Sequence, residues 1–249
     1  MRSFYMDDFK TYPKDLITIL DKFRPELAKF LNRKPDIQAE IAMLQLDATS
    51  FYEEPALHEL KRKIFDCLNT LEIHAYHNTR VLSKENIKES GLEPLERTSY
   101  LKRLSTILDQ SPFREEKVEL LKELKPFFAG ERGERESLLA FYVSKTRCSD
   151  YKKFGKNVGG EVAEFAFEAS HQDVLNYLWK IGKPVTVEFL IPVKNIYWCG
   201  FRAYFMVSEL CRKYIYQREL NRNYEINFDA QTKTAILPQS IVSVTCMTS

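Results

Sequence analysis

The chain has 249 residues, a length that fits one large domain or two small ones. Its 37 basic and 35 acidic residues leave a net charge of +2, which excludes a whole-chain electrostatic field that would bind nucleic acid or an anionic membrane surface. Apolar residues make up 44% of the chain and aromatic residues 13%, a composition that indicates a packed core and excludes long disorder.

The N-terminal stretch, the apolar runs and the cysteines bear on localisation. The N-terminal stretch MRSFYMDDFKTY has early acidic residues and no continuous apolar segment, so no signal peptide is expected. Because no run of about 18 apolar residues occurs, no membrane span is expected either. The five cysteines contain no CxxC pair, so we expect reduced thiols and no metal site. A cytoplasmic protein fits, and so does a protein delivered into a host cell.

The first 70 residues predict helices. Asp15–Leu31 places apolar residues three and four apart on one face, and Pro25 should kink or divide this helix. A second helix is predicted over Asp36–Leu46. Pro55 suits the first turn of a third helix, Ala56–Leu71.

A strand follows and leads into a short helix. The stretch LEIHAYH from Leu71 alternates with a period of two, which is typical of a strand and puts His77 on its apolar side. Ser83 has the character of a helix N-cap. A short helix, Lys84–Ser90, is predicted after it, ended by Gly91.

The rest of the chain predicts helices first and then mostly strands. The predicted elements in chain order are helices Thr98–Asp109 and Arg114–Leu124, a break at Ala129–Glu134, strands Leu138–Ser144 and Glu161–Glu168, helix Ser170–Ile181, strand Val185–Val193, helix Phe205–Arg218, and strands Tyr224–Phe228, Lys233–Leu237 and Ile241–Cys246. The predicted fold class is therefore α+β. An N-terminal helical region of residues 1–70 precedes a mixed, mainly antiparallel β-sheet domain with flanking helices over residues 71–249.

His77, Thr79 and Arg80 form the first candidate site, at the expected end of the first strand. An imidazole, a hydroxyl and a cationic fork together can hold a polar, phosphorylated ligand. The alternative is that His77 makes one backbone hydrogen bond and Arg80 is solvated.

The second candidate element is the predicted loop Ser144–Glu161. It holds three of the eight glycines, among them Gly159 and Gly160, which permit a close approach of the backbone to a ligand. Tyr151 offers a ring face, and Glu161 offers a carboxylate at the start of the expected strand. The alternative is a surface loop whose glycines form turns.

These residues carry a resemblance to a known family. The sequence HNTR from His77, followed by a short helix that ends in GL and then by PL, resembles the HxT-R…GL-PL pattern of small bacterial proteins related to the ADP-ribosyltransferase fold. The stretch YKKFGKNVGGEVAEFAFE from Tyr151 resembles a Y…G…G-x-x-x-x-F segment of bacterial families. The resemblance covers roughly Ile73–Phe167. An HGT glycine and an STS motif are not found in this sequence, and Glu161 is not part of an ExE pair.

The resemblance implies that NAD is the substrate. In that superfamily a histidine on the first strand holds the nicotinamide ribose, an aromatic or hydroxyl residue follows on a later strand, and a glutamate often completes the site. The residues implied as catalytic are His77, Tyr151 and Glu161, and those implied as NAD contacts are His77, Thr79, Arg80, Ser144, Gly159 and Gly160. Arg80 would contact phosphate, Tyr151 would stack, and Glu161 would be the carboxylate.

The implied function is that of an NAD-dependent ADP-ribosyltransferase or NAD glycohydrolase. Such a protein would be a bacterial toxin, effector or defence protein, with a nucleotide substrate, a protein target and no membrane partner. The other function class is a non-catalytic domain that uses the same cleft to bind a nucleotide or a protein. Release of nicotinamide from NAD separates the two classes.

Overall fold

The structure, a computed structural model, describes residues 2–32, 55–128, 137–150, 158, 160–197, 202–226 and 228–247. Within these ranges the chain has an α+β fold in which helices accompany a six-stranded, mainly antiparallel sheet, and this confirms the predicted fold class. No helix in the described part of the chain is long and apolar enough to cross a membrane.

The chain divides into two compact units, each built from three segments. The first unit contains Met1–Ala75, Tyr142–Arg147 and Leu190–Ala230, and the second contains Tyr76–Phe141, Cys148–Phe189 and Gln231–Ser249. The division predicted at residue 70 separates the chain differently, and it stays a prediction.

The sheet has the strand order β5-β3-β2-β4-β6, with β1 paired to β2 beside this path. The strands are β1 Arg2–Phe4, β2 Leu71–Val81, β3 Leu139–Tyr142, β4 Lys183–Pro192, β5 Asp229–Thr232 and β6 Ile241–Cys246. β1 runs parallel to β2, with Phe4 opposite Ile73. β4 and β6 are antiparallel, with Val187 opposite Val244. The sequence did not predict β1, because three residues are too few to show an alternation.

Two of the closing strands were predicted at the wrong place. The described residues of Tyr224–Phe228 form no strand, and within Lys233–Leu237 only Ile236 pairs, in an isolated bridge with Leu92. The real strand, β5, lies between these two stretches. Its sequence, DAQT, carries little of the apolar alternation that marks a strand, whereas the apolar stretches on both sides of it have the composition of strands.

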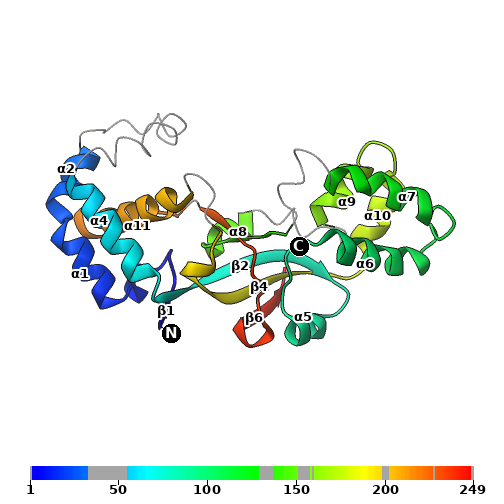
Figure 1. Cartoon of the computed structure of the whole chain (residues 1–249), viewed down its shortest axis with the longest axis horizontal. Coiled ribbons are helices and arrows are strands. Elements are labelled where there is room, and N and C mark those ends of the chain that lie inside the picture. The colour runs from blue at the N-terminus through cyan, green and yellow to red at the C-terminus, as the bar shows by residue number, and fades with distance from the viewer. Residues whose placement is uncertain are drawn as a thin grey trace. The chain divides into compact units, whose positions relative to one another are not determined.

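Four helices of the first unit pack together (Figure 1): α1 Lys14–Lys22, α2 Arg24–Asn32, α4 Pro55–Leu68 and α11 Arg202–Glu219. The predicted helix Asp15–Leu31 is divided as expected, and its break at Phe23 comes two residues before Pro25. Pro55 begins α4 as predicted. The predicted helix Asp36–Leu46 lies outside the described residues.

The second unit has its own helical cluster (Figure 1), formed by α6 Arg97–Asp109, α7 Lys117–Leu124, α9 Gly160–Phe167 and α10 Gln172–Lys180. Its buried centre includes Leu104, Leu124 and Leu178. Outside this cluster lie α5 Lys84–Ser90 and α8 Lys145–Asp150. Among the residues that the structure describes, short 3-10 helices cover Phe9–Thr11, Lys125–Phe128, Val193–Asn195 and Pro238–Ser240.

The strand predicted at Glu161–Glu168 is wrong, because this stretch forms α9. Its apolar residues satisfy two periods at once. Ala163, Ala166 and Phe167 lie three and four residues apart, and all three are buried, which is the helical solution. Phe165, which a strand would turn to the same side as Phe167, is instead 49% exposed.

The prediction for α5 is confirmed at both ends. The Ser83 hydroxyl accepts a hydrogen bond from the Glu85 amide at 3.2 Å, as an N-cap should. Gly91 ends the helix with φ of 78° and donates its amide to Ile87 O at 2.8 Å. A Cβ at Gly91 would lie 1.9 Å from Ile236 O, so only glycine fits this turn.

Candidate functional site

The strand β2 carries the first group of candidate residues. It continues to Val81, so His77, Thr79 and Arg80 lie within the strand and not beyond its end. Before Ala75 the buried residues of β2 lie on one face of the strand, the face of Ala75 itself. Ala75 and Tyr76 are both buried, and from Tyr76 onward the buried residues lie on the opposite face. His77 and Thr79 are half-buried and share one face, and Arg80 belongs to the opposite one.

The His77 ring is fixed by a neighbouring strand. Its Nδ1 lies 2.8 Å from Ala140 O of β3. Since a carbonyl oxygen only accepts, Nδ1 must carry the proton of this hydrogen bond. Burial lowers the pKa of His77, so the imidazole is neutral and Nε2 is left as an acceptor. The alternative in which His77 makes one backbone hydrogen bond agrees with this geometry. That bond is made by Nδ1, and Nε2 has no hydrogen-bond partner among the described residues.

Arg80 is bound to backbone carbonyls. Its Nη1 donates to Ile181 O at 3.2 Å and to Gly182 O at 2.9 Å, just beyond the C-terminal end of α10. A cation is favourable there because helix carbonyls are unsatisfied and carry partial negative charge. Burial lowers the pKa of Arg80. The interpretation of Arg80 as a solvated side chain is therefore wrong, and its contact with a phosphate stays a prediction.

The predicted loop Ser144–Glu161 is not a loop throughout. It contains α8 and the beginning of α9. Ser144 is fully buried, and its hydroxyl accepts from the Arg147 amide at 3.4 Å. Tyr151 and Gly159 lie outside the described residues.

Gly160 and Glu161 open α9. Gly160 has φ of 62°, and a Cβ there would meet no atom within 4 Å. Glu161 is half-buried in the first turn of this helix, so its carboxylate is held by a helix and not by a strand. The roles of both residues toward NAD stay predictions.

One buried polar cluster was missed by the sequence interpretation. Asn78 is 5% exposed, and its Nδ2 donates to Cys148 O at 2.6 Å. Its Oδ1 accepts from Thr186 Oγ1 at 2.8 Å and from Cys148 Sγ at 3.0 Å. Burial raises the pKa of Cys148 to about 12, so the sulfur is a protonated thiol that can donate. The amide of Asn78 therefore joins β2 to β4 and α8.

A signal for Asn78 was present in the sequence. An amide in the interior of an alternating strand is uncommon and needs partners when it is buried. The alternation also placed Asn78 on the face opposite His77, next to Tyr76. What the sequence did not contain was the identity of the partners.

Comparison of the chain with models of known families, with curated proteins and with solved structures found no match. In the described part of the chain, no group of three or more His, Cys, Asp or Glu side chains is placed to hold a metal ion. The geometry of β2 and its neighbours is therefore the basis for a functional proposal.

Proposed function

We propose that the chain binds NAD and breaks its nicotinamide–ribose bond, either as an ADP-ribosyltransferase or as an NAD glycohydrolase. The observation that carries the proposal is the state of His77. Its Nδ1–H is held by Ala140 O at 2.8 Å, and its pKa is lowered by burial. A neutral ring held at one nitrogen presents a fixed acceptor, Nε2, which suits a ribose hydroxyl.

Thr79 supports the same proposal because it is half-buried on the same face of β2 as His77. One acceptor and one hydroxyl two residues apart can hold the two neighbouring hydroxyls of a ribose. The resemblance of HNTR to the HxT pattern also implies that His77 and Thr79 bind the ribose. In this proposal Ser144, Gly159 and Gly160 complete the NAD contacts, and Tyr151 stacks on the nicotinamide.

The chemistry requires little beyond positioning. The C1′–N bond breaks, its electron pair leaves with neutral nicotinamide, and the ribose develops an oxocarbenium-like positive charge. Water or a nucleophile of a target protein then adds to C1′ and loses a proton. Glu161 is proposed as the carboxylate that stabilises the positive charge.

A second candidate, a non-catalytic nucleotide-binding domain, is favoured by one observation. Arg80 is engaged by Ile181 and Gly182, and Ser144 is fully buried, so two of the predicted contacts already serve the fold. A cleft with fewer available polar groups can bind a nucleotide without catalysis. This candidate predicts NAD binding with no release of nicotinamide.

The test is nicotinamide release from NAD by the purified full-length chain. We expect His77→Ala and Glu161→Gln each to lower the rate by about 100-fold, in the range that single positioned groups contribute. His58→Ala, at an exposed residue of α4, and Glu164→Gln, one turn after Glu161 on α9, are the matched controls and should keep the rate.

Each outcome has a defined meaning. Release that persists in both site variants would overturn the site. If the unmodified chain releases no nicotinamide but binds NAD in calorimetry, the non-catalytic candidate replaces the enzyme. If it neither binds nor cleaves NAD, the enzyme is ruled out, and the second candidate is ruled out as an NAD-binding domain.

A further inference from the structure

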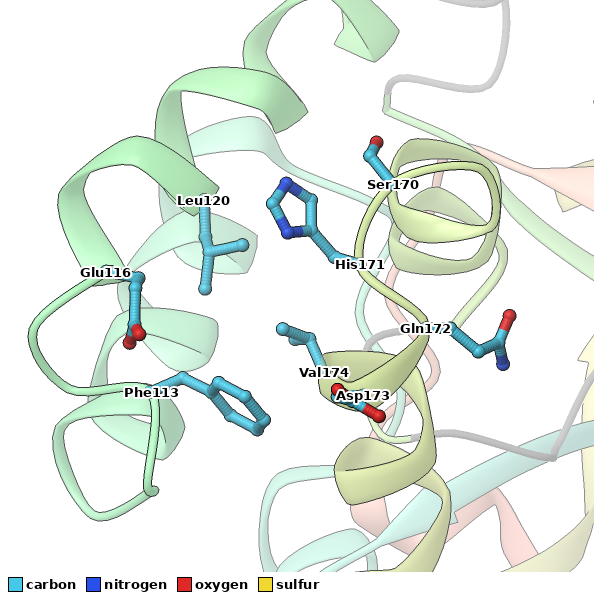
Figure 2. A pocket seen from close by; sticks show the side chains of 8 residues that line it. All are labelled: Phe113, Glu116, Leu120, Ser170, His171, Gln172, Asp173 and Val174. Atoms are coloured by element: carbon cyan, nitrogen blue, oxygen red, sulfur yellow. The ribbon is translucent and has the colours of Figure 1, made fainter.

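A cavity of about 330 Å³ lies in the helical cluster of the second unit (Figure 2), and none of the residues proposed for NAD is among those that line it. It is bounded by the connection between α6 and α7, by α7, and by the turn that leads into α10. The residues that line it are Phe113, Glu116, Leu120, Ser170, His171, Gln172, Asp173 and Val174. Its size is at the lower end for a small-molecule site.

The inner part of the cavity is apolar. Leu120 and Val174 are buried members of the helical core, and Phe113 is half-buried beside them. Figure 2 shows these three side chains turned toward the same space. The Phe113 ring also meets the Tyr177 ring edge-on, with centroids 6.0 Å apart, so its orientation is fixed by packing.

The rim of the cavity is acidic. Glu116 precedes α7 and Asp173 lies in the first turn of α10, and both are exposed. Neither carboxylate forms an ion pair with a residue in the described ranges. Lys117, the neighbour of Glu116, is bound instead to Asp109 at 2.5 Å.

The imidazole of His171, which also lines the cavity, has a carboxylate partner of its own. His171 Nε2 lies 2.9 Å from Glu123 Oε1, so a protonated His171 would be paired with this carboxylate. Figure 2 shows the His171 ring turned toward Leu120. The rim therefore has a net negative charge above an apolar, aromatic interior.

We infer that this cavity binds a small organic amine with an apolar body, a function separate from the proposed use of NAD. The ammonium group would lie at the acidic rim, where the negative charges of Glu116 and Asp173 attract it. The apolar body would lie against Leu120, Val174 and the ring of Phe113, which also attracts a cation. A carboxylate ligand of the same shape would be repelled by the same rim.

The test uses calorimetry on the full-length chain at pH 7 and low salt. The probes are 2-phenylethylamine, its neutral analogue 2-phenylethanol, and the anion 3-phenylpropanoate. We expect the amine to bind at least about fivefold more tightly than the alcohol, and the anion to bind most weakly, because exposed charge pairs contribute modestly. Equal binding of the amine and the alcohol, or no binding of the amine, would overturn the inference.

Variants locate the amine. Asp173→Asn and Glu116→Gln should each weaken amine binding by roughly three- to tenfold and leave alcohol binding unchanged. Glu168→Gln, at an exposed carboxylate beyond the end of α9, is the matched control and should change neither. These are surface substitutions, so the folded state should persist, and an unchanged thermal transition verifies it. Amine binding that is insensitive to both rim variants would place the amine elsewhere and overturn the inference.

Discussion

Replacing Asn78 by alanine tests whether the buried polar cluster holds the second unit together. The Asn78 side chain donates one hydrogen bond, to Cys148 O at 2.6 Å. It accepts two, from Thr186 Oγ1 at 2.8 Å and from Cys148 Sγ at 3.0 Å. These bonds connect a strand, a second strand and a helix that are distant in the sequence. Asn78→Ala removes all three bonds and adds no new partner.

The magnitude follows from what the substitution leaves behind. Cys148 O loses a donor while the Cys148 thiol and the Thr186 hydroxyl lose their acceptor. Leaving a buried polar group unpaired costs about 1–3 kcal/mol, and the missing amide adds a small cavity. Because the thiol is a weak donor and Thr186 is only half-buried, we expect a total loss of about 3 kcal/mol. Thr186→Val, which removes one bond, should lose about 1 kcal/mol.

Alkylation of Cys148 is the assay. The thiol is fully buried and its pKa is raised to about 12, so it reacts only when this part of the chain opens. Mass spectrometry of the peptide that contains Cys148 separates it from the other cysteines. A loss of about 3 kcal/mol should raise the alkylation rate by about 100-fold under native conditions.

Asn86→Ala is the matched control for Asn78→Ala. Asn86 is exposed on α5, where the same change of side chain should alter the rate of Cys148 alkylation by no more than about twofold. A rise of less than about threefold in Asn78→Ala would refute the reasoning. It would show that the three hydrogen bonds contribute no more than the exchange of the same groups with water.

Two further predictions concern the backbone turn after α10 and the imidazole of β2. Gly182→Ala should destabilise the chain by about 2–3 kcal/mol in urea unfolding followed by tryptophan fluorescence, because its φ is 70° and a Cβ would lie 2.6 Å from Val81 O. Gly160→Ala shares the positive φ but meets no atom within 4 Å, so it should lose only about 1 kcal/mol, and equal losses would show that the contact with Val81 is unimportant. Burial lowers the pKa of His77 in the folded chain. When the pH is lowered below 6.5, the ordinary pKa of a histidine, the unfolded chain therefore takes up a proton that the folded chain does not, and the free energy of unfolding decreases. Between pH 7 and pH 5 the unmodified chain should therefore lose stability more steeply than His77→Gln, and parallel curves would contradict the neutral imidazole.

The elements that the sequence predicted well are those with local signals. Ser83 and Gly91 mark the two ends of α5 because an N-cap hydroxyl and a positive φ are properties of single residues. The alternation of LEIHAYH is likewise visible without any knowledge of neighbouring strands. The division of the first helix near Pro25 follows from the missing amide of proline.

The partners of the polar side chains were not predictable in the same way. Asn78 bonds to residues 70 and 108 positions away along the chain. Arg80 bonds to carbonyls 101 and 102 positions away. Local periodicity states only on which face such a side chain lies, while its partner depends on the order of strands in the sheet. The sequence therefore does not distinguish an arginine that binds carbonyls at a helix end from an arginine that binds the phosphate of a ligand.

The error at α9 changes how the proposed carboxylate must act. A strand at Glu161 would have aligned this side chain with the sheet that carries His77, whereas the structure places it in the first turn of a helix. The start of a helix stabilises negative charge, which suits a carboxylate that must remain ionised opposite a positive ribose. On a helix, Glu161 shares its face with Glu164 one turn later, while Ala163 and Phe167 face the core. A catalytic role therefore requires that loss of Glu161 lowers nicotinamide release and that loss of Glu164 does not, because a general effect of acidic charge on this face would lower both.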